Sequence, residues 1–310
     1  MLSDNKLRLT KDRHMKTIRI TTLLVAGIVA AGCAVTPNPI DIGAPAPQHP
    51  DRITNVWVAP PVDQTRLPIG NSHVSGTTPA VGGLFACAPG GPGRPGGGGP
   101  WINPGTETWD ATKKAEVPGD TAWKQARYSE RIENNTRRIR SNGLPVGTRT
   151  GRFPGGGNPG TIKGFDFDAA IPLASQAAPE PVCVPRGPVG VMKNGVLIFD
   201  PLDLPGRDAL VYEIEDHCGG HPQGAGVYHY HAASPCAISA AKGPSTVIGF
   251  AWDGTPIVVE RDQANNLPTN ADLDVCHGRV SPIMLDGNIV SVYHYSATYE
   301  FPYLIGCLRN

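Results

Sequence analysis

Four Asx-Gly dipeptides, each lying between two apolar runs, constrain the fold of this chain more than any other feature. They are Asn142-Gly143, Asn194-Gly195, Asp253-Gly254 and Asp286-Gly287. Asn, Asp and Gly tolerate the positive φ angles that a tight β-hairpin turn requires. The flanking runs are rich in Val, Ile, Phe, Tyr and Trp, which favour strands. The pattern predicts a mainly β domain of antiparallel hairpins, arranged as a sandwich or a compact barrel-like fold, although the composition of residues 121–140 also suits a helix.

Glycine and proline are concentrated before this region. The run APGGPGRPGGGGP at 88–100 can form neither a helix nor a strand ladder, because proline lacks the backbone donor and glycine is costly to order. The stretch TPNPIDIGAPAPQHP at 36–50 is similarly poor in core residues. We therefore expect a Pro/Gly-rich tether over residues 33–100 and one packed β domain over residues 101–310, which is long enough for a sizeable core.

The N-terminal segment has the form of an export signal. From Met15, a short basic region with Lys16 and Arg19 precedes an apolar stretch over 20–31, which is too short to span a membrane. Small residues before Cys33 resemble a bacterial lipobox, although Ala30 stands where leucine is more usual. Residues 1–32 are thus a predicted signal segment whose true start is Met15. The sequence predicts an outer-membrane lipoprotein attached through Cys33, or otherwise a periplasmic or secreted protein.

The remaining six cysteines are even in number, which in an oxidising compartment favours three disulfides. They are Cys87, Cys183, Cys218, Cys236, Cys276 and Cys307. Spacing alone permits 15 connectivities. The preferred local pairs are Cys218–Cys236 and Cys276–Cys307, each closing a loop around a histidine-containing strand, which leaves Cys87–Cys183.

The charges balance, with 27 Lys and Arg against 27 Asp and Glu. No global field therefore favours nucleic acid or an anionic surface. The single basic run, RRIR at 137–140, is typical of a solvated strand or loop. The chain also lacks a phosphate loop, a dinucleotide fingerprint and a nucleophile elbow, so its sequence does not support a conventional enzyme.

The stretch Tyr228-His229-Tyr230-His231 alternates two residue types. Side chains two apart on a strand share a face, so both histidines are predicted to point one way and both tyrosines the other. The same Tyr-His-Tyr pattern recurs where His294 lies between Tyr293 and Tyr295. If the two strands are neighbours in the sheet, three imidazoles converge on one face.

These segments resemble a known family. The stretches DHCGGHPQGAGVYHYH, GFAWDGTPIVV, LDVCHGRV and VYHYSATYEFPYLIGC are similar to those of YHYH-domain proteins, as are RIRSNGLPVGTRTGRFP and VGVMKNGVLIFDP upstream. The resemblance covers residues 101–310 and implies an exported, β-rich domain without an assigned activity. Two departures are the absence of a histidine at Val146-Gly147-Thr148 and the presence of Ser296 after the second Tyr-His-Tyr.

A metal site is the sharper hypothesis for the histidines. A His-x-His pair plus one histidine from a neighbouring strand supplies three nitrogen ligands with an open position, and in an exported protein zinc or copper is the expected ion. The predicted ligands are His221, His229, His231 and His294. The residues predicted to orient them, or to act as acid or base, are Asp216, Asp253 and Glu300. For His217 and His277 a structural role is the better interpretation.

Three function classes remain open. A metal-binding surface protein needs only the ligands. A metal-dependent hydrolase or oxidoreductase also needs an open coordination position and an adjacent acid–base group, for which Asp253 or Glu300 could serve. In a non-metal adhesion or carbohydrate-binding module, histidine and tyrosine would be structural, and aromatic rings would serve as stacking platforms. The tryptophans available for that role include Trp101, Trp109, Trp123 and Trp252.

Overall fold

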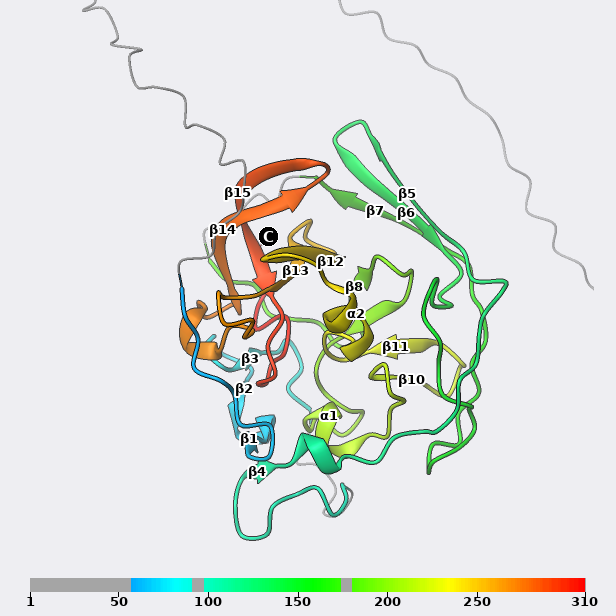
Figure 1. The fold of residues 1–310 in the computed structure, drawn as a ribbon, viewed down its shortest axis with the longest axis vertical. Coiled ribbons are helices and arrows are strands. Elements are labelled where there is room, and N and C mark those ends of the chain that lie inside the picture. Colours follow the sequence, from blue (N-terminus) through cyan, green and yellow to red (C-terminus); the bar gives the residue numbers. More distant parts are fainter. Residues whose placement is uncertain (1–56, 91–97, 174–179, 310) are drawn as a thin grey trace, which may run out of the picture. The chain divides into compact units, whose positions relative to one another are not determined.

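A computed structural model describes residues 57–90, 98–173 and 180–309 of the chain (Figure 1). The predicted signal segment over 1–32, its start at Met15 and the lipidation residue Cys33 lie outside these residues. Within the described part, no helix combines the length and apolar character needed to cross a bilayer.

The largest element is an eight-stranded sheet with the order β10-β11-β9-β8-β12-β13-β15-β14. Its strands are β8 (Pro188–Met192), β9 (Leu197–Phe199), β10 (Gly220–Pro222), β11 (Tyr228–Tyr230), β12 (Ser245–Ala251), β13 (Pro256–Glu260), β14 (Gly278–Leu285) and β15 (Asn288–Ser296). All neighbours run antiparallel except β11 beside β9 and β13 beside β15.

Smaller elements surround this sheet. A three-stranded antiparallel sheet is formed by β5 (Tyr128–Glu133), β6 (Thr136–Ser141) and β7 (Phe167–Pro172). Two-stranded pairs are β1 (Leu67–Pro68) with β4 (Thr108–Trp109), and β2 (Val74–Ser75) with β3 (Leu84–Phe85). The helices are short: α1 (Ala209–Tyr212), α2 (Pro235–Ala240), and 3-10 turns at Gly70–His73, Ala111–Lys113 and Asn270–Asp272.

Three of the four Asx-Gly hairpins are confirmed. Asn194-Gly195 joins β8 to β9, Asp253-Gly254 joins β12 to β13, and Asp286-Gly287 joins β14 to β15. Asn142-Gly143 instead follows the end of β6. The hairpin between β5 and β6 turns at Asn134-Asn135, with φ angles of 48° and 60°. Residues 121–140 therefore contain strands rather than a helix.

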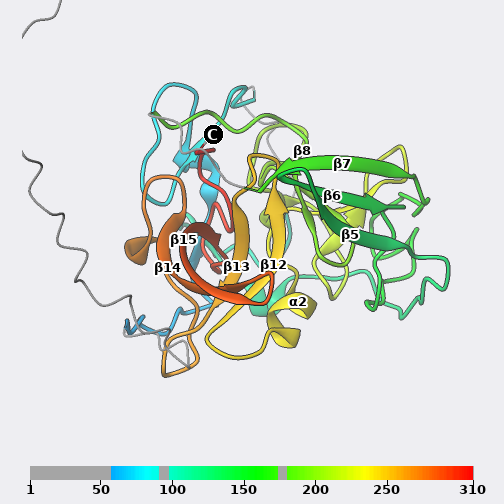
Figure 2. The same ribbon diagram turned by 90° about the horizontal axis from the view of Figure 1, so that it is seen from above.

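The three-stranded sheet packs against the middle of the large one, and Figure 2 shows β5, β6 and β7 lying beside β8 and β12. Ile139 and Ile171 from the small sheet are buried in one cluster with residues of β8, β9 and β12. Within the basic run, Arg138 and Arg140 both pair with Asp168. The two sheets thus share a core, which confirms the expected mainly β, disulfide-bonded fold with antiparallel strands.

The packed region begins before Trp101. The expected boundary between a tether over residues 33–100 and a domain over residues 101–310 therefore lies too far along the chain. Leu84 and Ala86 are each 1% exposed and belong to the main core cluster. The described residues from Trp57 onward belong to a single compact unit by their contacts. Between residues 57 and 90, glycines and prolines interrupt the apolar residues so often that these residues carry no strand periodicity.

All three expected disulfides are present. Cys87 is bonded to Cys183, Cys218 to Cys236, and Cys276 to Cys307. The first ties the segment after β3 to the start of the large sheet, and the other two each staple one histidine-containing hairpin. Disulfides form and persist in oxidising compartments, which indicates an exported protein.

Candidate metal centre

Three histidines meet at one edge of the large sheet. His221 on β10 lies directly opposite His229 on β11 in the antiparallel register. His231 follows the end of β11, two residues on, and therefore shares the face of His229. One ring nitrogen from each of the three lies within 4.8 Å of the other two, and all three side chains are buried.

The tyrosines between these histidines point into the core on the opposite face. Tyr228 and Tyr230 are both fully buried, and their rings pack edge to face. The Tyr228 hydroxyl donates to the carboxylate of Asp216, at 2.9 and 3.0 Å. The Asn194 amide donates to the Tyr230 hydroxyl at 3.1 Å. The alternation predicted for the Tyr-His-Tyr-His strand is confirmed, and the buried tyrosines fix the position of the histidines.

Two of the imidazoles are oriented by backbone carbonyls. The Nδ1 of His229 lies 3.0 Å from the carbonyl oxygen of Val227, and the Nδ1 of His231 lies 2.5 Å from that of Asp200. A carbonyl oxygen only accepts, so both Nδ1 atoms carry the hydrogen, which leaves a lone pair on each Nε2 of the neutral ring. Metal-ligating histidines are commonly held in this way.

The two Nε2 atoms face one another. They lie 3.2 Å apart, with both Nδ1 atoms already committed as donors. Two lone pairs at this distance repel unless a proton or a metal ion lies between them. A zinc ion with bonds of 2.0–2.1 Å in tetrahedral geometry places its ligand atoms about 3.3–3.4 Å apart, which is close to the observed separation.

A carboxylate completes the group. Glu213, in the segment between α1 and β10, places its Oε2 3.0 Å from the Nε2 of His221 and 3.1 Å from that of His231. The Glu213 Oε2 and the His221 Nε2 are nevertheless buried atoms without a hydrogen-bond partner among the described residues. Glu213 thus places one carboxylate oxygen close to two of the three imidazole nitrogens.

The pKa values reflect this crowding. Burial raises the pKa of Glu213, but its contacts with His221 and His231 outweigh burial and hold it well below the usual range. Burial lowers the pKa of His231, but Glu213 outweighs that effect and raises it. Burial, together with the charges of the two other imidazoles, holds the pKa of His229 well below its ordinary value. At neutral pH the site therefore combines a carboxylate with at least one neutral imidazole.

The centre lines an open cavity of about 770 Å³. Asn158, Arg186 and Leu204 form other parts of the wall. The ring of Phe199 stacks on His229 with the centroids 4.0 Å apart. The cavity therefore borders the three-histidine group, and the Phe199 ring covers one face of His229.

The structure does not bring His294 to this centre. Four strands (β9, β8, β12 and β13) separate β11 from β15 in the sheet, so the two Tyr-His strands are not neighbours. The Nε2 of His294 instead lies 3.2 Å from Glu260, and both side chains are fully buried. The expected convergence of His294 with His229 and His231 is therefore wrong, because each strand pairs within its own hairpin and with a parallel partner.

The three carboxylates that were expected to orient the imidazoles bind other groups instead. Besides Tyr228, Asp216 binds the backbone NH of Cys218 at 2.9 Å. Asp253 accepts from the Tyr295 hydroxyl at 2.6 Å, and Glu300 from the backbone NH of Asn270 at 2.7 Å. The residue that does meet the imidazoles, Glu213, was missed. It lies among three acidic residues in VYEIEDHC, and nothing in that sequence distinguishes it.

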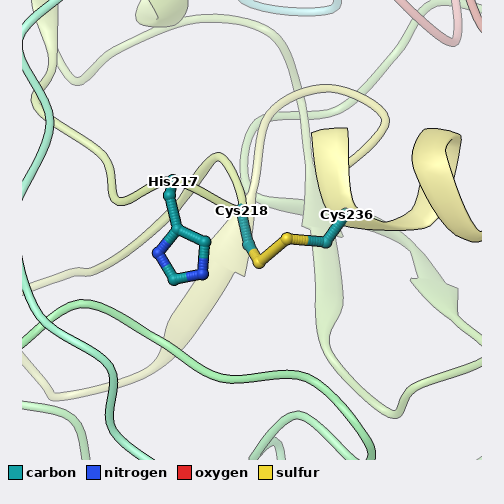
Figure 3. A group of neighbouring side chains, drawn as sticks. All are labelled: His217, Cys218 and Cys236. Atoms are coloured by element: carbon teal, nitrogen blue, oxygen red, sulfur yellow. A yellow bond between two sulfur atoms is a disulfide. The ribbon is translucent and has the colours of Figure 1, made fainter.

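A second group of potential ligands is ruled out by its covalent state. His217 lies beside Cys218 and Cys236, whose sulfur atoms are joined in a disulfide (Figure 3). A metal ligand must be a thiolate, which a disulfide does not provide. His217 is exposed, whereas His277 is buried with its Nε2 3.1 Å from the Thr298 hydroxyl. Neither forms part of the three-histidine group.

The tryptophans considered as stacking platforms are largely enclosed. Trp101 and Trp109 are each 4% exposed and belong to one buried cluster. Trp123 and Trp252 are half-buried, and their indole NH groups donate to Thr150 and to the carbonyl of Pro188. The first two rings are therefore core residues rather than a carbohydrate-binding surface.

Comparison with known proteins agrees with the resemblance. The family model described as YHYH protein matches residues 168–269, a range that includes Glu213 and the three-histidine group and ends before His294. Over these residues the chain is similar to YHYH proteins. No curated protein and no solved structure matches the chain significantly.

Proposed function

We propose that the YHYH domain of this chain holds one transition-metal ion between His221, His229 and His231, with Glu213 beside it. The observation that carries the proposal is the 3.2 Å separation of the His229 and His231 Nε2 atoms, whose Nδ1 atoms both donate to backbone carbonyls. The carboxylate oxygen of Glu213, 3.0 and 3.1 Å from two of the imidazoles, adds a negative charge that favours a cation.

Zinc or copper(II) suits this set of ligands best. Imidazole nitrogen binds both ions well, and a single nearby carboxylate is compatible with either. Calcium and magnesium prefer oxygen ligands and would bind weakly to three imidazole nitrogens. Both Zn²⁺ and Cu²⁺ are available to a protein outside the cytoplasm, where the three disulfides indicate that this chain folds.

The decisive experiment is the metal content of protein purified without a His-tag. Inductively coupled plasma mass spectrometry should find about one equivalent per chain, which is removed by a chelator and restored by dialysis against ZnSO4 or CuSO4. His217→Ala is the matched control, because His217 is an exposed histidine outside the group. Wild-type protein that stays below about 0.1 equivalent at saturating zinc and copper would refute the proposal.

A metal-dependent hydrolase is the second candidate, favoured by the open cavity beside the imidazoles. Three protein ligands leave a coordination position for water, and such an ion would supply Lewis-acid chemistry there. In this role the Glu213 carboxylate would accept the proton, and its distances of 3.0 and 3.1 Å from two of the imidazoles support the assignment. Glu213→Gln should then keep the metal content but abolish hydrolysis of a chromogenic ester or phosphodiester, whereas equal activity in both proteins contradicts this role.

Envelope attachment is proposed from the sequence, with support from the disulfides. The apolar segment over 20–31 and the small residues before Cys33 favour cleavage and lipidation at that cysteine. Cys33→Ser, or treatment with globomycin, should then leave an unprocessed precursor and abolish partitioning into detergent. A mature form without lipid that starts at another residue would leave secretion as the route.

A further inference from the structure

The large sheet consists of two halves with the same internal order. From its centre outward, one half runs β8-β9-β11-β10 and the other runs β12-β13-β15-β14. In each half the first and second strands are antiparallel, the second and third are parallel, and the third and fourth are antiparallel. The two halves meet where β8 pairs antiparallel with β12.

The register across this junction is symmetric. Gly190 pairs with Ala251, Val191 with Phe250, and Met192 with Gly249. Within the halves, Gly190 pairs with Ile198 just as Gly249 pairs with Ile257.

The backbones at the two glycines approach equally closely. A Cβ on Gly190 would lie 2.6 Å from the Phe250 carbonyl oxygen, and one on Gly249 would lie 2.6 Å from that of Val191. A local two-fold axis therefore passes through the Val191–Phe250 pair.

The motifs before the outer hairpins correspond as well. Asp216 accepts from the backbone NH of Cys218 and from the hydroxyl of Tyr228. Asp274 accepts in the same way from Cys276, at 2.9 Å, and from Tyr293, at 3.0 Å. Each of these cysteines is in a disulfide with a cysteine that follows the Tyr-His-Tyr strand.

The histidine positions can be compared through this correspondence. His294 matches His229, because each lies between two tyrosines and has its Nδ1 3.0 Å from the carbonyl oxygen two residues earlier. Opposite His229 on the neighbouring strand is His221, and opposite His294 is Arg279. Ser296 takes the place of His231, two residues after the central histidine.

A buried carboxylate faces both sets of residues. Glu260 is fully buried, with its Oε2 2.8 Å from the Arg279 Nε and 3.0 Å from the Ser296 hydroxyl. It arrives from the end of β13, whereas Glu213 arrives from the segment between α1 and β10, so the shared feature is the charge arrangement and not the carboxylate's place in the chain. The ring of Trp57 covers the Arg279 guanidinium with 4.3 Å between the group and the ring centroid.

We infer that the two halves are copies of one structural unit, and that Arg279 carries in the second copy the positive charge that a metal ion supplies in the first. The second part of this inference rests on the proposed function. Arg279 and Ser296 occupy two of the three corresponding positions, and the guanidinium pairs with the buried carboxylate without an ion. The chain is thus a one-ion protein built from two potential sites.

The first test restores the second site. In untagged protein saturated with zinc and then desalted, wild type should retain about one equivalent, and Arg279→His combined with Ser296→His should retain about two. His294→Ala added to that pair should return the content to one. A double variant with unchanged circular dichroism that still holds one ion would overturn the inference.

The second test makes the reverse change and does not need the ion. His221→Arg places a guanidinium beside Glu213, whereas His221→Ala leaves that carboxylate facing a void. In excess chelator, His221→Arg should melt at a clearly higher temperature than His221→Ala, and zinc should shift the melting temperature of neither. An arginine variant that melts at or below the alanine variant would overturn the charge replacement.

The two tests separate failure of this inference from failure of the proposed function. Wild-type protein without zinc would refute the metal site, and the chelator comparison would still decide whether a guanidinium can occupy this position. Wild type with one equivalent, together with failure of both variant tests, would refute the inference alone.

Discussion

The Nε2 atoms of His229 and His231 face each other at 3.2 Å while both rings donate their Nδ1 hydrogens to backbone carbonyls. The relationship follows from strand geometry, because alternate side chains share a face. It is stable only with a positive charge between or beside the two nitrogens. Glu213 lies against the same group and increases its preference for a cation.

Removing either member of this pair should remove the ion. His229→Ala and His231→Ala each delete one of three imidazole ligands, so zinc affinity should fall by more than about 100-fold, beyond the 10–100-fold loss typical of changes around a ligand. Competition with a chromophoric zinc chelator measures the change.

Tyr228→Phe is the control on the same strand for those variants. It removes the hydroxyl that donates to Asp216 on the opposite face, and should cost about 1–3 kcal/mol of stability while leaving zinc affinity within a few-fold. A comparable affinity loss in Tyr228→Phe and His229→Ala would assign the effect to folding instead.

Metal should stabilise the folded protein by an amount that rises with the logarithm of the free metal concentration. Because the site forms only in the native chain, zinc at about 100 times its Kd should add about 2.7 kcal/mol to the free energy of unfolding. Differential scanning calorimetry with zinc and with a chelator measures this shift. His229→Ala should show no zinc-dependent shift, and an equal shift in that variant would point to binding elsewhere.

A third prediction concerns acid stability and His277. Burial lowers the pKa of His277 to about 3, far below the 6.5 of an exposed imidazole. The unfolded chain then binds the proton more readily, so this stabilisation is complete above pH 6.5 and declines as the pH falls from 6.5 toward 3. The slope should approach about 1.4 kcal/mol per pH unit.

Chelator-treated His277→Asn isolates this contribution. Asparagine tolerates the positive φ of 69° at this position and does not titrate. Urea unfolding between pH 6.5 and 5 should show a shallower pH dependence in the variant than in wild type. Parallel stability curves would mean that His277 binds its proton as readily in the folded as in the unfolded protein.

The disulfide of the second half should be a major source of stability. Cys276 and Cys307 are both fully buried and are separated by 31 residues. Loss of a native disulfide typically costs about 2–5 kcal/mol. Cys276→Ala with Cys307→Ala should therefore lower the melting temperature markedly in oxidised protein. If the double variant melts at the same temperature as wild type, the disulfide contributes little to stability.

Local sequence patterns predicted much of the fold. Asx-Gly turns identified three hairpins because the required backbone conformation is local, and the alternation of Tyr228 to His231 predicted which side chains share a face. The strand order was not predictable, since the parallel pairing of β11 with β9 joins segments that no local pattern connects. That order is why His294 lies in a different half of the sheet.

The sequence predicted only the part of the candidate site that local structure determines. His221, His229 and His231 lie in one continuous hairpin, so their proximity follows from a single local register. Glu213 reaches the group from the segment after α1, and its approach depends on how that segment packs. A nearby acidic residue of the same sequence cluster, Asp216, binds Tyr228 instead, and only the folded structure separates their roles.

Anomalous X-ray scattering from zinc-loaded, untagged crystals tests the central claim most directly. Data collected above and below the zinc absorption edge should place one peak per chain about 2.0–2.1 Å from the Nε2 atoms of His221, His229 and His231. No peak is expected beside His294 and Glu260. A zinc peak away from the three imidazoles, or an empty three-histidine group at saturating zinc, would contradict the account.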